Sequence, residues 1–244
     1  MNVRLGFPQG GTARPLQRPP HRCAGESNYP IHLVESLTLR DGAALTIRPI
    51  CSDDYQLELD FIRALSARSG YQRLLSPRKL SIAEIQRFVR IDYSRELALI
   101  ALAVVDGKVQ QVAVARYAPE PDDSSCDFGI VIADAWQGRG LGEALLRSLV
   151  RAAAEAGVQE LTGLTLADNH AMRELAGRLG FSIQRDPHDA TVVQLRMPLR
   201  NHSRSSTPFG GRPAGTGMLN APAFTLEHDD FQVGSWAETG ISPH

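Results

Sequence analysis

The sequence predicts a mixed α/β fold, with a central sheet of about six or seven strands flanked by about four helices. Three observations predict it. Apolar, β-branched runs alternate with segments of helical periodicity between residues 44 and 198. Asp106-Gly107 separates two of these runs, which is typical of a β-hairpin. A glycine-rich stretch at 138–142 follows a third run and precedes a long amphipathic segment, which indicates a strand-to-helix turn.

Strand runs and helix-start signals predict the first half of the fold. The run ALTIRPI (44–50) predicts a strand, and Ser52-Asp53-Asp54 marks the start of the helix after it. Ser81 and Glu84 have the spacing of a capping box, which predicts a second, short helix. The runs LALIALAVV (97–105), VQQVAVARY (109–117) and CDFGIVI (126–132) predict a three-stranded antiparallel meander.

Helices and strands alternate in the second half. Leucines spaced by four residues from Leu141 predict a long helix that ends near Gly157. LTGLTL (161–166) predicts a strand, and Asp168-Asn169 predicts the cap of a helix that ends at Gly180. Strands near 181–185 and 191–197 complete the unit.

One folded unit is expected at 37–200, between tails at 1–36 and 201–244. Both tails are rich in Pro and Gly and lack hydrophobic periodicity. Segments of this composition bury too little apolar surface to offset the entropy of ordering the chain. We therefore expect both tails to be disordered.

Composition argues against several classes of partner. Lys and Arg total 26 against 27 Asp and Glu, and this balance predicts no nucleic-acid partner. The longest apolar run, 97–105, is far shorter than the roughly 20 residues that span a bilayer, so no membrane segment is expected. Three cysteines without a CxxC pair favour a reducing, cytoplasmic location and predict no metal site.

The glycine-rich turn reads Gln137-Gly138-Arg139-Gly140-Leu141-Gly142. A helix that starts here presents unpaired N–H groups and the positive end of its dipole, which together bind a phosphate well. Glycines let such a ligand approach the main chain. The turn lacks the Lys-Ser or Lys-Thr of a P-loop, and Glu143 stands where a dinucleotide fingerprint needs glycine. The alternative is a tight turn that needs glycine for its geometry alone.

Residues 137–142 and the segment ADNHAMRELAGRLGF (167–181) resemble the two motifs of the GNAT acetyltransferase superfamily, and the resemblance covers roughly residues 44–198. It implies a GNAT-like sheet that binds an acyl-CoA, with acetyl-CoA as co-substrate. By this resemblance the main chain of 137–142 holds the pyrophosphate, and Val131 and Ile132 pair with the pantetheine amides. Asn169 either hydrogen-bonds the pantetheine arm or only caps its helix.

The stretches LTIRPI, IDYSRELALIAL, VAVARY and WQGRGLGEALL resemble the GNAT domain of bacterial Pat-type protein lysine acetyltransferases. This implies an N-acetyltransferase that modifies a lysine of a protein, such as an acyl-CoA synthetase, by direct attack of the amine on the thioester. Those relatives carry Glu ten residues before the Gln of the glycine motif, where this sequence has Asp127. Asp127 is therefore the predicted general base; the alternative is an ordinary polar residue on a strand's solvent face.

Two other functions remain open on the sequence. One is a GNAT enzyme that acts on a small-molecule amine, because the motifs concern the acyl-CoA and not the acceptor. The other is a non-catalytic acyl-CoA-binding module, because the usual Glu is replaced by Asp127.

Overall fold

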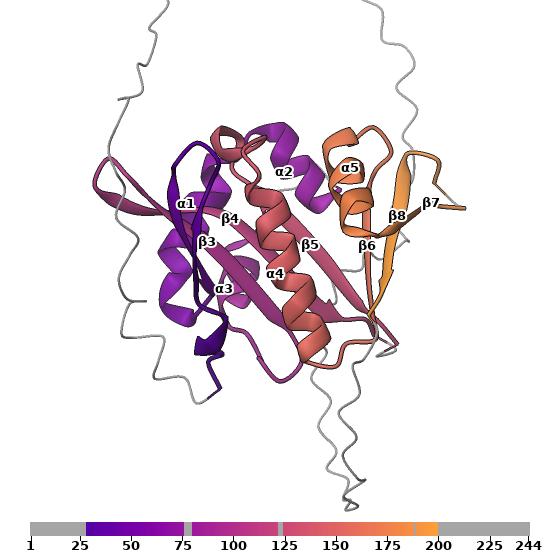
Figure 1. Cartoon of the computed structure of the whole chain (residues 1–244), viewed down its shortest axis with the longest axis horizontal. Helices are drawn as coiled ribbons and strands as arrows, with labels where there is room; N and C mark the ends of the chain where they lie inside the picture. The colour runs from indigo at the N-terminus through magenta and orange to yellow at the C-terminus, as the bar shows by residue number, and fades with distance from the viewer. Residues whose placement is uncertain (1–27, 76–79, 122–123, 188, 200–244) are drawn as a thin grey trace, which may run out of the picture.

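The computed structural model describes residues 28–75, 80–121, 124–187 and 189–199. Within them one eight-stranded sheet runs in the order β1-β2-β3-β4-β5-β6-β8-β7, with helices on both faces (Figure 1). The strands are β1 (Glu35–Thr38), β2 (Ala44–Pro49), β3 (Leu97–Val105), β4 (Lys108–Pro119), β5 (Cys126–Ile132), β6 (Glu160–Leu166), β7 (Ser182–Arg185) and β8 (Val192–Pro198). The helices are α1 (Tyr55–Ala64), α2 (Ala67–Leu74), α3 (Ile82–Val89), α4 (Leu141–Glu155) and α5 (His170–Leu179), with 3-10 turns at Ile31–Leu33, Ser52–Asp54 and Asp134–Trp136.

The predicted mixed α/β class is confirmed, but the described chain holds one strand more than expected. Strand β1 pairs antiparallel with β2, from Glu35 opposite Ile47 to Thr38 opposite Ala44. Leu33, just before it, packs into the core. Folded structure thus begins before residue 37, inside the expected tail, because a four-residue strand is too short to show a pattern in sequence. The rest of the two expected tails, 1–27 and 200–244, lies outside the described residues.

Helix α2 is a second addition to the expected order. Its sequence, ARSGYQRL, carries no continuous apolar stripe and contains Gly70, so periodicity does not reveal it. Its start is stabilised by Ser66, whose hydroxyl accepts a hydrogen bond from the Ser69 N–H at 3.2 Å. The helix is held by contacts to the rest of the fold, which are described below with the site.

The sheet separates two apolar layers. Helices α4 and α5 cover one face, where Leu145, Leu149 and Ala176 join the larger core. Helices α1 and α3 cover the other, where Phe61 and Val89 pack on Ile100. Figure 1 shows α4 in front of the central strands and α1 and α3 behind them. Because β3 lies between both layers, it is buried from Leu97 through Ala103, as a continuous apolar run predicts.

The structure confirms two local features that the sequence predicts, a hairpin turn and a helix cap. Asp106 and Gly107 have φ values of 50° and 75°, the left-handed pair that a two-residue hairpin turn requires. The capping box of α3 forms, with Ser81 Oγ accepting from the Glu84 N–H and the Glu84 carboxylate accepting from the Ser81 N–H. These turns and caps fix where the neighbouring strands and helices begin and end.

Within the described residues no helix has the length and apolar character to cross a membrane. The same residues contain no group of three or more His, Cys, Asp or Glu side chains arranged to hold a metal ion. The expected cytoplasmic location stays a prediction.

Candidate functional site

The site is an opening between two parallel strands. Strands β5 and β6 pair at only two positions, Cys126 with Leu161 and Asp127 with Thr162. Beyond them the strands carry no further ladder pairs and separate toward the glycine turn, as Figure 1 shows. At about 3.4 Å per residue, the open part of β5 from Asp127 to Ile132 is roughly 17 Å long. Main-chain groups along this edge are therefore available to an extended ligand.

Gly163 allows the strands to meet at the closed end of the opening. A Cβ atom on this residue would lie 2.9 Å from Phe128 Cε1 and 3.0 Å from the Phe128 carbonyl oxygen. Any side chain at position 163 would therefore push β6 away from β5. Glycine at this point keeps the closed end tight while the other end opens.

The glycine turn lies at the wide end of the opening. Gly138 and Gly140 have φ values of 71° and 88°, a conformation that other residues adopt only with strain. A Cβ on either would meet no atom within 4 Å, so the space above the turn is open. Gly142 differs, because it is helical and its Cβ would touch Leu175 Cδ2 at 3.4 Å and Ile132 Cγ1 at 3.8 Å.

Helix α4 begins directly after the turn, with Gly140 as its N-cap residue. Within the described chain the N–H groups of Leu141, Gly142 and Glu143 have no main-chain acceptor; the Ala144 N–H bonds to the Gly140 carbonyl. The Leu141 side chain is fully buried in the core, so this residue can offer a ligand only its main chain. The arrangement is a set of outward N–H donors at the positive end of a helix.

The side chains of Gln137 and Arg139 are engaged by the protein itself. Gln137 Nε2 donates to the Ile132 carbonyl at 3.0 Å, so this oxygen at the edge of the opening already has a partner. Arg139 Nε donates to Asp41 Oδ2 at 2.6 Å, and its guanidinium lies 4.2 Å from the centre of the Trp136 ring. The ion pair lowers the pKa of the Asp41 carboxyl. Both side chains brace the turn from outside.

Helix α2 is tied to the segment between β5 and the turn. Asp134 Oδ1 accepts from the hydroxyls of Ser66 and Ser69 at 2.8 Å each, and its Oδ2 accepts from the Ser66 N–H at 3.0 Å. Gln137 Nε2 adds a contact to Ser69 Oγ at 3.2 Å. Hydrogen bonds from Ser66 and Ser69 lower the pKa of the Asp134 carboxyl against the opposing effect of burial. We call these four residues the α2 latch; no sequence signal links its two halves, which are 65 to 68 residues apart.

Asn169 lies across the opening, at the start of α5. Its Oδ1 accepts from the Met172 N–H at 3.2 Å, which is the helix-cap role, and its Nδ2 donates to Thr165 Oγ1 at 3.1 Å. The role as a cap is thus observed. The Asn169 side chain already has these two partners, and a pantetheine arm would have to share it with them. Contact between Asn169 and the pantetheine arm therefore stays a prediction.

Asp127 lies at the closed end, on the sheet face that α1 and α3 cover. Neighbouring Cys126 and Phe128 point to the opposite face and join the core. Burial, aided by the charge of Glu120, raises the pKa of the partly buried Asp127 carboxyl to about 7, against a smaller opposing effect of the Phe128 N–H. A carboxyl with this pKa can take up or release a proton near neutral pH. The interpretation of Asp127 as a merely solvent-facing residue is not supported by this environment.

Two residues of the closed end were missed in the sequence. Thr162 pairs with Asp127 on β6, and its Oγ1 hydroxyl donates to Glu120 Oε1 at 3.0 Å. Glu120 directly follows β4, and its N–H donates to the Ser125 carbonyl at 2.9 Å. Counting the hairpin register outward from its turn would have placed Glu120 near Asp127, but the turn length is not certain from sequence.

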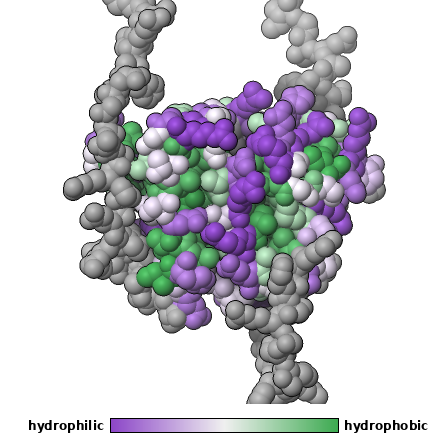
Figure 2. Space-filling view, in the orientation of Figure 1, coloured by the Kyte–Doolittle hydropathy of each residue, from purple (hydrophilic) through white to green (hydrophobic). Residues whose placement is uncertain are grey.

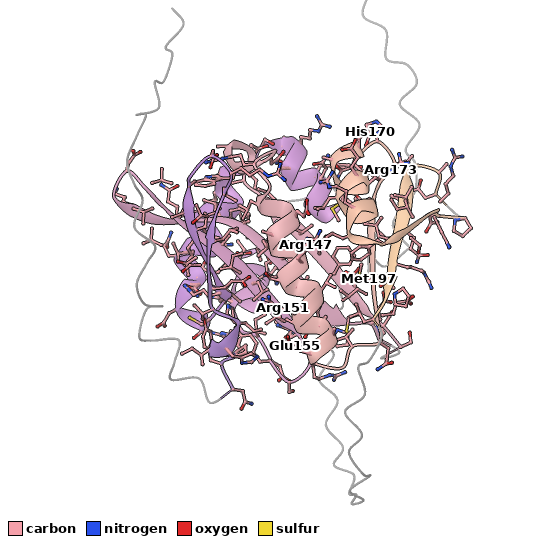
Figure 3. The ribbon with its side chains drawn as sticks, in the orientation of Figure 1. Arg147, Arg151, Glu155, His170, Arg173 and Met197 are labelled. Atoms are coloured by element: carbon pink, nitrogen blue, oxygen red, sulfur yellow. The ribbon has the colours of Figure 1, made fainter. Side chains whose placement is uncertain are left out.

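The outer surface of α4 does not belong to this site. Figure 2 shows hydrophilic residues over the middle of this face with apolar surface on both sides, and Figure 3 shows Arg147, Arg151 and Glu155 along the outward side of α4. Arg147 pairs with Glu143 at 2.9 Å and Arg151 with Glu35 at 3.0 Å. These exposed pairs contribute little to stability.

A separate hollow of about 420 Å³ lies among α5, β7 and β8, where Arg173, Ile183 and Val193 line it. It shares no lining residue with the opening between β5 and β6. Asp127 is not among the residues that line this hollow, so we do not include the hollow in the candidate site.

Known proteins that resemble this chain in sequence are acetyltransferases. Residues 44–182, more than half of the chain, match the family model described as an acetyltransferase (GNAT) domain. The acetyltransferase PA5475 of Pseudomonas aeruginosa is 37% identical over 169 residues, which are 69% of this chain and 90% of that protein. The acetyltransferase Pat of Mycolicibacterium smegmatis is 27% identical over 161 residues, 66% of this chain and 48% of that protein. The present chain therefore spans about half the length of the mycobacterial relative.

Two solved structures superpose on the fold of this chain. The GNAT domain of S. lividans PAT superposes with a TM-score of 0.64 at 28% identity, over 70% of this chain and 100% of that one. The yncA protein of Salmonella typhimurium, solved with its cofactor acetyl-CoA, superposes with a TM-score of 0.54 over 67% of this chain and 99% of that one. At 16% identity this second match concerns the fold alone.

Proposed function

Because the chain belongs to the GNAT acetyltransferase family, we propose that it transfers an acetyl group from acetyl-CoA to a primary amine, namely a lysine side chain of a protein. One observation carries the proposal. Strands β5 and β6 part after two ladder pairs, and the opening leads from the glycine turn to a carboxyl group, that of Asp127. A long, thin co-substrate with phosphates at one end and a reactive thioester at the other suits such an opening.

The co-substrate is held by main-chain groups. The N–H groups at the start of α4 bind the pyrophosphate, and Gly138 and Gly140 leave the space above them free. Along the unpaired edge of β5, Ile132 binds the pantetheine amides as a neighbouring strand would, whereas the main chain of Val131 faces β4 because the hydrogen-bonded pairs of this ladder alternate from the Ala133 N–H bond to the Val112 carbonyl. Gln137 and Arg139 act indirectly, since they hold the turn in shape. The Ile132 carbonyl already accepts a hydrogen bond from the Gln137 side chain, so Ile132 contributes its N–H group.

The chemistry needs a base and no covalent intermediate. A lysine amine has a pKa of about 10.4, so it is protonated at neutral pH and cannot attack. The Asp127 carboxylate accepts a proton from the ammonium group. The amine nitrogen then forms a bond to the thioester carbonyl carbon, the carbon–sulfur bond breaks, and the second amine proton passes to the departing thiolate, so the products are the amide and the CoA thiol. Cys126 is excluded as a nucleophile because its side chain packs in the core on the other face of β5.

Support for a protein lysine as acceptor comes from the Pat-type stretches of the sequence and from the similarity to the mycobacterial and S. lividans proteins. An acyl-CoA synthetase is the first acceptor to test. A small-molecule amine and a purely acyl-CoA-binding role are the competing outcomes.

The test combines transfer and binding measurements on the full chain. Labelled acetyl-CoA is incubated with an acyl-CoA synthetase, lysine peptides and small amines, and acetyl-CoA affinity is measured by calorimetry. Asp127→Asn is expected to lower kcat by about 10²- to 10⁴-fold, the usual contribution of a general base, with unchanged affinity. Asp60→Asn, a matched change on the exposed surface of α1, leaves both quantities unchanged.

Each outcome decides a different point. Full transfer by Asp127→Asn shows that this carboxylate is not the base. Tight binding without transfer to any acceptor shows a sensor module. Transfer to small amines alone replaces the protein acceptor.

A further inference from the structure

The closed end of the opening holds a carboxylate that the family motifs do not include. We propose that Glu120 is a positioning residue for the base: fixed by Thr162 beside Asp127, its negative charge makes Asp127 a stronger proton acceptor. This inference rests on the proposed function for its kinetic consequence. Its electrostatic part concerns the free protein and can be measured without any substrate.

Three neighbouring strands bring the groups together. The β4–β5 ladder places Ala118 opposite Asp127 and ends with Pro119 opposite Cys126. Glu120 follows directly, and its N–H bond to the Ser125 carbonyl continues the hairpin by one residue. From the other side, Thr162 is in register with Asp127, so their side chains share one face of the sheet.

Thr162 fixes the Glu120 carboxylate on that face. Its side chain is buried, and its hydroxyl donates to Glu120 Oε1 at 3.0 Å. A buried hydroxyl that binds one carboxylate oxygen limits the rotamers of a glutamate that would otherwise be free to turn into solvent. The negative charge of Glu120 therefore stays near Asp127.

Other charged side chains on this face of the sheet are compensated. Arg48 of β2 forms a two-pronged pair with Asp54, and Arg116 of β4 lies 3.8 Å from Glu58 of α1. Glu160 of β6 lies 3.6 Å from Arg196 of β8.

Glu120 has no ion-pair partner among the described residues. Its negative charge is therefore not compensated there, and it acts on the neighbouring Asp127 carboxyl. Burial is the larger cause of the raised pKa of Asp127, and the charge of Glu120 is the second.

The consequence for catalysis is a matter of base strength. An aspartate at its ordinary pKa of 3.8 takes a proton from an ammonium group only weakly. With a pKa of about 7, Asp127 accepts that proton more readily and is still ionised in about half of the molecules at pH 7. Glu120 thus increases the rate without touching the reacting atoms.

Two readouts test the proposal on the full chain. The carboxyl carbon of Asp127 is titrated by NMR, and kcat/KM for acetyl transfer is measured against pH. In the parent we expect both midpoints at about pH 7, and therefore transfer at pH 6 at about one tenth of its plateau. Glu120→Gln moves both midpoints to lower pH, yet keeps them above 3.8 because burial remains.

Two further variants separate charge from structure. Thr162→Val keeps the charge of Glu120 but removes the hydrogen bond that fixes its carboxylate beside Asp127. Both midpoints therefore shift in the same direction as in Glu120→Gln, by a smaller amount. Glu160→Gln removes a paired carboxylate from the same face and leaves both midpoints in place.

An unchanged Asp127 midpoint in Glu120→Gln overturns the inference, and so does an equal shift in Glu160→Gln. If Glu120→Gln fails to fold, Thr162→Val decides in the same way. A chain that transfers no acetyl group refutes the proposed function, while the NMR titration still decides the role of Glu120.

Discussion

Replacing Gly140 with alanine tests whether the glycine turn binds the co-substrate through its main chain. Gly140 has a φ of 88°, and a residue with a Cβ in the left-handed region costs about 1–2 kcal/mol. The described protein places no atom within 4 Å of the new Cβ, so strain and not a clash destabilises the variant. For a domain of this size, about 1 kcal/mol lowers Tm by about 2–4 °C, so we expect a decrease of about 2–8 °C.

The same methyl group enters the open space above the turn, where the pyrophosphate is proposed to bind. If the strain is relieved by a change in the direction of the N–H groups, acetyl-CoA affinity falls by about tenfold for each 1.4 kcal/mol. Thermal unfolding followed by circular dichroism measures the first effect, and calorimetric titration with acetyl-CoA measures the second.

Gly142→Ala is the matched control in the same turn. Its backbone is helical, and the new methyl group meets Leu175 and Ile132 at ordinary contact distances of 3.4 Å and 3.8 Å. Alanine is favoured over glycine in a helix by about 1 kcal/mol, so stability is unchanged or increased and affinity is unchanged. Parent-like acetyl-CoA affinity in Gly140→Ala, or an equal loss in both variants, would refute the argument for a main-chain cradle.

Two other perturbations follow from the site. At pH 8 the partly buried Asp127 carboxylate is charged in the native state. Its pKa is about 7 in the native state and 3.8 in the unfolded state, so the native state binds more protons between these two pH values. The free energy of unfolding therefore falls as pH rises through that window. Asp127→Asn is therefore expected to be more stable than the parent at pH 8, by up to about 4 kcal/mol at 1.36 kcal/mol per pKa unit, and nearly equal to it at pH 4; a parent as stable as the variant at pH 8 would contradict the raised pKa. Asp134→Ala removes the acceptor of the α2 latch, so hydrogen exchange in 66–74 should become faster, while exchange in β3, which requires unfolding of the whole domain, is unchanged. Unchanged exchange in 66–74 would show that the latch does not hold α2.

Features whose geometry is encoded within a few residues were predictable. Asp106-Gly107 predicts its hairpin because few residue pairs accept two positive φ values. The capping box at Ser81 and the glycines at 138 and 140 are local in the same way. Fold class followed from the order of these elements, and the family followed from two short motifs.

Features that depend on distant contacts were not predictable from pattern alone. Strand β1 is short and is stabilised by pairing with β2, and α2 is held by Asp134, which is 65 residues beyond Ser69. The side chain of Gln137, in the glycine turn, bonds to Ile132 and to Ser69, a residue 68 positions away. A residue type shows which bonds are possible, but only the neighbours supplied by the fold decide which bonds form.

By itself, the sequence determined a mixed α/β unit with a glycine turn at a helix start and a carboxylate at position 127. Those properties depend on backbone preferences and on short-range periodicity, which each segment carries with it. Only the tertiary structure decided that β5 and β6 part after Asp127 and that Thr162 holds Glu120 beside it. Burial and the nearness of a second charge raise the pKa of Asp127, and both exist only when three strands have come together.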